Sequence, residues 1–256
     1  MKALKLLLLL FVMTAPIFAF DIKTGEDLIV AMHKKYDGKW YKTLTFSQQT
    51  ITHHPDGTTN SEKWYEAMSV PGDLRIDFAD SKTGDGILFA GGKVYSFRDG
   101  KPATGRPFVH PLLVLGFDIY MQPTATTIEQ VKAMGIDLSS VHAEMWMGKA
   151  VYVVGAKQGD LNTPQVWVDK KDLVFVRLIQ LGGKDKKTVQ ETQFNKYIKV
   201  KGGGWVSAEV KFFVDSKPTT TEEYSDIQTG IKLDSSLWDP EKWAAADRSY
   251  YKLRKR

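Results

Sequence analysis

The chain of 256 residues contains no cysteine. Disulfide bonds, thiol catalysis and lipid attachment to an N-terminal cysteine are therefore excluded. A chain of this length buries a core large enough to fold without disulfides. The stability of the fold must therefore come from packing and polar contacts alone.

Long apolar runs are also scarce, and the run at the N-terminus is too short to span a bilayer. Lys2 and Lys5 precede an apolar stretch over residues 6–13, and the small residue Ala19 follows it. This order is typical of a secretory signal peptide, so we predict residues 1–19 to be one, cleaved after Ala19. An exported chain without disulfides fits a bacterial periplasm, where we expect the mature protein to be soluble.

An excess of one charge is confined to the two ends of the chain. The formal net charge is +5, but two lysines lie in the predicted signal peptide and five basic residues lie within residues 247–256. The body between them is close to neutral, which argues against nucleic acid as a partner, since such a groove needs clustered cations. We expect residues 247–256 to form a basic, disordered tail.

Combinations of residues that predict catalysis or a cofactor are missing from the sequence. His53 and His54 are adjacent, so on a strand they would point to opposite faces. A metal site at these residues is therefore a weaker interpretation than the end of a hairpin strand. His110 is expected to pack or to cap a helix, and Glu222 and Glu223 to be solvated. The glycine runs resemble turns rather than phosphate loops. The sequence therefore predicts neither an enzyme nor a bound cofactor or metal.

Alternating apolar and polar residues dominate what is present. In WVSAEVKFFVD, residues 205–215, the apolar positions repeat every second residue, which is typical of a strand with one buried face. About eleven such runs follow one another between tight turns. The sequence therefore predicts a mainly β domain over residues 20–246, with a few helices. Its architecture would be a single strongly curved antiparallel sheet, an incomplete barrel.

Only a few helical segments are available to cover this sheet. An N-cap at Thr24 and a stripe through Leu28, Ile29 and Met32 predict a helix over residues 21–36. Short helices are also expected within residues 108–120 and 127–135. These helices are too few to fill the concave face, so we predict an apolar cavity there. The expected lining includes Phe108, Leu112, Leu113, Leu115, Phe117, Val210 and Phe212.

The order of several segments resembles a known family. These segments are LTFSQQT, WYEAMSVPGDLRIDF, GILFAGGKVYSF, PLLVLGFDI, VWVDKKDLVFVRLI and the run from GGGW to PEKW. The sequence is similar to the outer-membrane lipoprotein-sorting carriers of the LolA/LolB-like superfamily. The resemblance implies a lid formed by residues 108–120 and the N-terminal helix, with Phe46, Trp64, Leu74 and Ile76 facing the cavity.

The same resemblance implies a function. Such proteins carry the acyl chains of lipoproteins or other lipids through the periplasm, from an inner-membrane donor to an outer-membrane acceptor. We expect this chain to act as a monomer. The carriers often have an arginine before the proline in the turn preceding LRIDF, whereas here Val70 precedes Pro71. A lipid other than a lipoprotein therefore remains an alternative cargo. A non-transport envelope sensor or interaction module on the same fold remains an alternative function.

Overall fold

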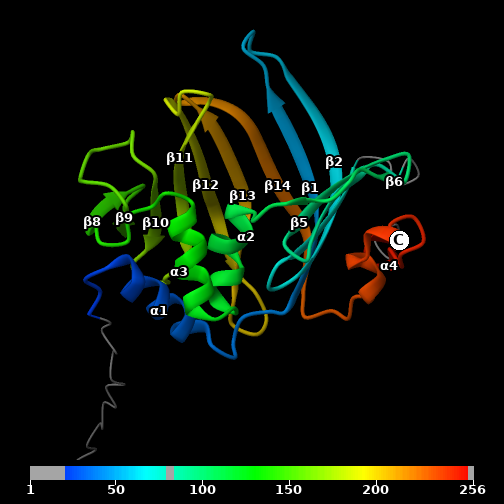
Figure 1. The fold of residues 1–256 in the computed structure, drawn as a ribbon, viewed down its shortest axis with the longest axis horizontal. Coiled ribbons are helices and arrows are strands. Elements are labelled where there is room, and N and C mark those ends of the chain that lie inside the picture. The colour runs from blue at the N-terminus through cyan, green and yellow to red at the C-terminus, as the bar shows by residue number, and fades with distance from the viewer. Residues whose placement is uncertain (1–20, 79–83, 253–256) are drawn as a thin grey trace, which may run out of the picture.

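The computed structural model describes residues 21–78 and 84–252 of the chain. These residues form one open antiparallel sheet of fourteen strands, with α1 to α3 against one face and the short C-terminal helices against the other (Figure 1). The prediction of a mainly β protein with a curved, open antiparallel sheet is confirmed. The predicted signal peptide over residues 1–19 lies outside the described residues. No helix within the described residues has the length and apolar character needed to cross a bilayer.

The strands follow one another along the chain in two groups separated by helices. The first group is β1 (Thr43–His53), β2 (Thr59–Ser69), β3 (Asp73–Phe78), β4 (Gly86–Ala90), β5 (Lys93–Arg98), β6 (Lys101–Pro102) and β7 (Arg106–Pro107). The second group is β8 (Val141–Trp146), β9 (Lys149–Val154), β10 (Gln165–Asp169), β11 (Phe175–Gly182), β12 (Thr188–Lys199), β13 (Trp205–Val214) and β14 (Lys217–Thr229).

The expected number of about eleven strands was too low, mainly because of β6 and β7. Each has only two residues, and both pair with β5. Two residues cannot display an alternating pattern, and proline, which lacks an N–H donor, is confined to edge strands. The sequence of this edge therefore resembled a loop.

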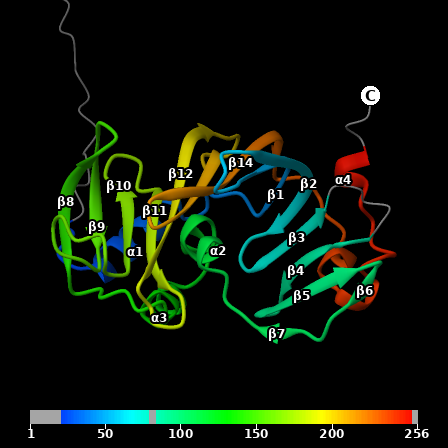
Figure 2. The same cartoon turned by 90° about the horizontal axis from the view of Figure 1, so that it is seen from above.

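The first and last strands meet in the middle of the sheet. The spatial order runs β6-β5-β4-β3-β2-β1-β14-β13-β12-β11-β10-β9-β8. Leu44 of β1 pairs with Thr229 of β14 across this centre. Seen from above, the sheet curves around the helices on its concave side (Figure 2).

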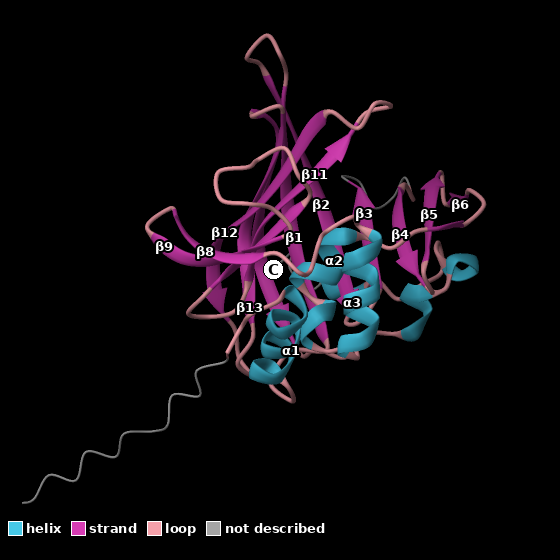
Figure 3. Cartoon of the chain, turned by 60° about the vertical axis from the view of Figure 1, so that its left-hand side comes forward, coloured by secondary structure: helices cyan, strands magenta, loops and turns pink. Residues whose placement is uncertain are grey.

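The concave side carries α1 (Gly25–Tyr36), α2 (Pro111–Gly116), the 3-10 turn η1 (Asp118–Tyr120) and α3 (Thr124–Ala133) (Figure 3). The predicted cap of α1 is confirmed. The Asp27 N–H donates to Thr24 Oγ1 at 3.1 Å, and the Thr24 N–H donates to Asp27 Oδ2 at 2.9 Å. This reciprocal capping box satisfies two of the backbone donors that a helix start leaves unpaired.

Replacing Thr24 with alanine should lower the free energy of unfolding by about 1 kcal/mol, because the N-cap acceptor is lost. Urea denaturation followed by circular dichroism would measure the change. Thr126→Ala is the matched control, since Thr126 is an exposed residue inside α3 and alanine favours helix. A Thr24→Ala variant as stable as Thr126→Ala would contradict a stabilising role for the capping box.

One half of the concave side is filled by the protein's own side chains. Leu28 and Met32 of α1 pack against Val154, Val166 and Phe175 of the sheet, and the void among them is only about 10 Å³. That volume is about the minimum for one water molecule. Helix α1 is therefore part of the solid core, and the expectation that it forms part of a lid is not met.

The convex side of the sheet is covered by the C-terminal segment. This segment comprises η2 (Ser235–Trp238), η3 (Pro240–Lys242) and α4 (Ser249–Lys252). Trp243 stacks on Phe97 of β5 with ring centroids 3.9 Å apart, and Tyr251 stacks on Tyr65 of β2 at 4.7 Å. Figure 2 shows α4 on the outer side of the sheet, away from α1 to α3.

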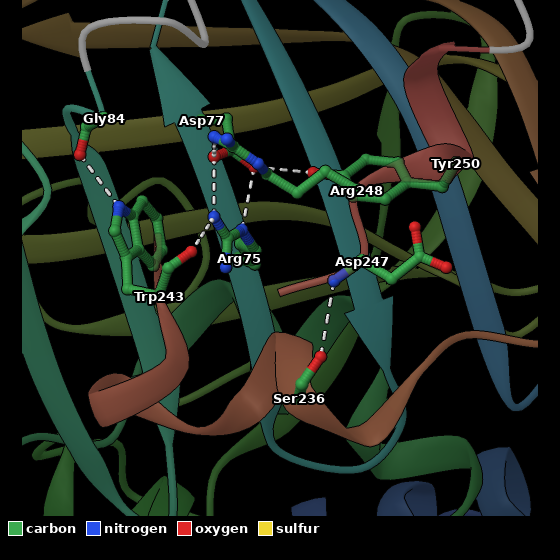
Figure 4. A network of polar contacts seen from close by, with 8 residues as sticks. All are labelled: Arg75, Asp77, Gly84, Ser236, Trp243, Asp247, Arg248 and Tyr250. Carbon is green, nitrogen blue, oxygen red and sulfur yellow. Dashed lines mark hydrogen bonds and ion pairs between the residues drawn. The ribbon is translucent and has the colours of Figure 1, made fainter. Parts of the chain in front are cut away.

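The prediction of a disordered tail from residue 247 is wrong for residues 247–252. Tyr250 and Tyr251 are buried, and the Tyr250 hydroxyl donates to Asp77 Oδ2 at 2.7 Å. Arg248 lies 3.6 Å from Asp77 Oδ1 (Figure 4). The aromatic residues and one arginine of the tail pack on the sheet because the buried carboxylate of Asp77 lies there and pairs with them. The remaining residues, 253–256, lie outside the described part of the chain.

Candidate functional site

A cavity of about 140 Å³ lies between α2 and the middle of the curved sheet. We call it the main cavity. Strands β1, β2 and β3 form one wall and β12, β13 and β14 the other. Because side chains alternate along a strand, every second residue of these strands faces it. Its lining residues are Phe46, Trp64, Glu66, Met68, Leu74, Ile76, His110, Leu112, Leu113, Phe117, Phe194, Phe212, Glu222 and Tyr224.

The structure brings eight of the eleven predicted site residues to the main cavity. They are Phe46, Trp64, Leu74, Ile76, Leu112, Leu113, Phe117 and Phe212. Leu115 instead faces the core beside α1, and Val210 is fully buried within the sheet core. Whether the eight contact a ligand remains a prediction.

The last predicted residue, Phe108, lies on a second cavity of about 200 Å³ that opens beside α2. We call this the rim cavity, lined among others by Pro71, Gly72, Phe89, Phe108, Val109, Leu113 and Asp118. Phe108 is 44 % exposed and Val109 49 % exposed, so they form an open apolar edge, while Lys93, Gln122 and Gln130 add polar atoms to the lining. His110 and Leu113 border both cavities, which places α2 as the partition between them.

His110 holds the first turn of this partition. Its Nδ1 accepts a hydrogen bond from the Leu112 N–H at 3.2 Å, so the expectation of a packed or capping histidine is confirmed. Burial lowers the pKa of His110 to about 4, and the ring is therefore neutral at neutral pH. At the other end of α2, Asp118 Oδ1 accepts from the Gly72 N–H at 3.0 Å.

Two carboxyl groups lie in the otherwise apolar wall of the main cavity. Burial raises the pKa of Glu66 well above its usual range, and the neighbouring Glu222 raises it further. Burial raises the pKa of Glu222 to about 7, although the Tyr224 hydroxyl donates to its Oε2 at 2.8 Å. Aromatic rings surround the pair, with Phe46 stacked on Tyr224 at 4.2 Å between centroids.

Sequence reasoning missed both acids. Glu222 was expected to be solvated, but it is half-buried and lines the main cavity. Glu66 is 5 % exposed and lies between Trp64 and Met68 on the inward face of β2. Side chains alternate along a strand, so the inward position expected for Trp64 implied that Glu66 also faces inward, and the signal was present in the pattern.

No protein-family model matches the sequence, and a search of curated proteins finds no match. Solved structures do match. A domain from Vibrio parahaemolyticus, named for outer membrane lipoprotein sorting, aligns with a TM-score of 0.58 at 12 % identity, over 84 % of this chain and 97 % of that one. A DUF1329 family protein from Desulfovibrio piger gives 0.55 at 15 % identity, over 84 % and 95 %.

A LolA superfamily protein from Nitrosomonas europaea aligns with a TM-score of 0.52 at 11 % identity, over 82 % of this chain and 96 % of that one. The chain has the fold of these proteins. The resemblance stated from the sequence is therefore confirmed at the level of the LolA-like fold. At such low identity the fold alone is shared, and function must be argued from the cavity itself.

Proposed function

We propose that the protein binds the acyl chain of a lipid or lipoprotein in the main cavity and carries it through the periplasm without making or breaking bonds. The observation that carries the proposal is an apolar, aromatic-lined cavity between the LolA-like sheet and α2. Most of the wall offers only carbon atoms to a ligand. A hydrocarbon chain is the ligand class that such a wall stabilises.

The volume of the main cavity, about 140 Å³, limits the size of the ligand that fits without a change of structure. A dry apolar cavity of about 150 Å³ accepts a ligand the size of benzene. A whole acyl chain needs more space, and the rim cavity on the other side of α2 provides it. An outward shift of α2 would join the two cavities, and each buried methylene would then contribute about 0.8 kcal/mol before costs.

Filling the cavity from α2, the partition, should weaken this binding strongly. Leu113→Trp places an indole ring where both cavities meet, so affinity for a fluorescent fatty acid should fall about tenfold or more. Ile76→Phe narrows the main cavity from the sheet side and should weaken binding in the same direction. Fluorescence titration of the purified full chain measures both.

Leu161→Trp is the control, because Leu161 is an exposed leucine in the loop between β9 and β10 that lines neither cavity. Its affinity should equal that of the unaltered protein. Thermal unfolding would verify that each variant is folded. Native mass spectrometry of protein isolated from cells should show a bound lipid. Folded protein without copurified lipid and without affinity for a fatty acid, a fatty alcohol or a fatty amine would refute the proposal and favour a sensor or interaction module.

A further inference from the structure

Two carboxyl groups dominate the polar chemistry of the main cavity. Glu66 and Glu222 offer four carboxyl oxygens. The Tyr224 hydroxyl donates to Glu222 Oε2, and the Gln48 side chain also hydrogen-bonds Glu222. Within the described residues, Glu66 has no hydrogen bond or ion pair, only the repulsion of Glu222.

A third acceptor lies on the same face of the sheet. Gln48 is 1 % exposed and stands on β1 between Trp64 of β2 and Tyr224 of β14, its directly paired neighbours. Its Nε2 donates to Thr50 Oγ1 at 2.8 Å. Its Oε1 is buried and has no hydrogen-bond partner in the described structure. The Gln48 amide also hydrogen-bonds Glu222, so Gln48 belongs to the polar group around the acids.

The cavity also lacks a cation. Neither lysine nor arginine appears among the residues that line it, and His110 is neutral. Buried carboxylates in proteins are normally paired with a positive charge. The rings of Phe46, Trp64, Phe212 and Tyr224 around the acids offer the π faces to which a cation is attracted.

We propose that the natural ligand has an apolar tail and a head group that donates hydrogen bonds, a protonated amine being the best match, which Glu66 and Glu222 recognise. The inference rests on the proposed function, since the tail occupies the same cavity. The shared chemistry is an amine on a hydrocarbon chain, whether it belongs to a membrane lipid or to a free amphiphile.

The test compares probes of equal chain length by isothermal titration calorimetry on the purified full chain. Dodecylamine should bind about tenfold or more tightly than dodecanoate, because a charge-assisted hydrogen bond replaces a repulsion. The preference should vanish in the Glu66→Gln/Glu222→Gln double variant, whose amides keep the size of the acids. It should persist in Glu223→Gln, since Glu223 is the exposed neighbour on the opposite face of β14.

The possible results separate the two claims. Equal affinity for dodecylamine, dodecanol and dodecanoate would overturn the inference and leave acyl-chain binding intact. Failure of every probe to bind would overturn both. Equal affinity for butylamine and dodecylamine would show that the tail contributes nothing, which also overturns both. Binding of phosphatidylethanolamine in detergent, set against phosphatidylglycerol, distinguishes a membrane lipid from a free amine.

A second readout needs no substitution. Because an ammonium group favours ionised carboxylates, amine binding should release a proton and weaken as the pH falls from about 8 to about 5.5. The titratable groups facing the acids are Tyr224 of β14 and His110 of α2, and neither changes charge in this range. Titration in two buffers of different ionisation enthalpy measures the released proton. No proton release near neutral pH would contradict recognition by the carboxylates.

Discussion

Replacing Asp77 with alanine is expected to lower the free energy of unfolding by about 3–5 kcal/mol, the usual cost of removing one partner from a buried ion pair. Arg75 is 0 % exposed, and its Nε and Nη2 donate to the two oxygens of Asp77 at 2.8 and 2.9 Å. Without Asp77, the guanidinium would keep a hydrogen bond to the Trp243 carbonyl oxygen at 3.1 Å and its contact with the Trp243 ring.

The loss should extend to the C-terminal segment, because Asp77 also accepts from the Tyr250 hydroxyl and lies near Arg248 (Figure 4). Arg75 and Asp77 alternate with Leu74 and Ile76 along β3, so they face the convex side, away from the main cavity. Stability and ligand affinity should therefore separate. Asp77→Ala protein that remains folded should bind a fatty acid as tightly as the unaltered chain.

Chemical denaturation measures this effect, and Lys132→Ala is the matched control. The Lys132–Glu26 pair has a similar distance, 2.8 Å, but both side chains are 48 % exposed. Its removal should cost less than about 1 kcal/mol. The Arg75→Met/Asp77→Leu double variant should recover much of the loss, because it leaves no unpaired buried charge. An Asp77→Ala change no larger than that of Lys132→Ala would contradict this account of the network.

Replacing Asp118 with asparagine should change the pH dependence of stability. Burial raises the pKa of Asp118 to about 7 in the folded protein, whereas an unfolded chain has about 3.9. Between these values the unfolded chain has released a proton that the folded protein retains. Stability should therefore fall as the pH rises from about 4 to about 7, and then level off.

Asparagine removes this dependence and keeps an oxygen that can accept from the Gly72 N–H. Asp118→Asn should match the unaltered protein near pH 4 and exceed its stability by up to about 4 kcal/mol near pH 8, since each pKa unit corresponds to about 1.4 kcal/mol. Urea denaturation across this range checks the difference. Because Glu66, Glu222 and Asp73 also have raised pKa values, only the difference between the two proteins isolates Asp118.

Asp137→Asn provides the control. Asp137 is exposed, and hydrogen bonds from Ser139 lower its pKa, so its substitution should affect stability only slightly and in the opposite direction. An Asp118→Asn curve parallel to that of the unaltered protein would show that Asp118 is ionised at no cost in the fold.

The alternating pattern was enough to predict most of the sheet. Together with the family resemblance it predicted much of the main cavity. The family resemblance assigned Trp64, Leu74 and Ile76 to the cavity, and a curved sheet brings inward faces together whatever the details of the loops. The apolar content of residues 108–120 was enough to predict a helical cover. It could not separate Leu115, which faces α1, from Leu113, which faces the cavity, because a short helix points neighbouring residues in different directions.

The buried acids and the docked tail were harder to predict, because each depends on a partner far away in the chain. Tyr250 is buried because it packs beside β3 and bonds Asp77, and Glu222 is covered because α2 lies over the main cavity. Neither of these partners is near in the chain, so the local sequence does not indicate them. A basic, polar composition near a chain end ordinarily indicates solvation. Here the acidic residue Asp77, more than a hundred positions earlier, reverses that expectation.

The pairing of β1 with β14 has a consequence for how the molecule forms. Strand β1 emerges first during synthesis, yet one of its two neighbours in the sheet is the last strand made. Each half of the chain can build its own hairpins early, but the seam between the halves must wait for the whole sequence. This seam is the one pairing of distant strands in the described strand order, and it forms late because a long loop must close before its contacts stabilise it. Loss of β14 would leave two bare strand edges in the centre of the sheet, where unpaired backbone invites association with other chains.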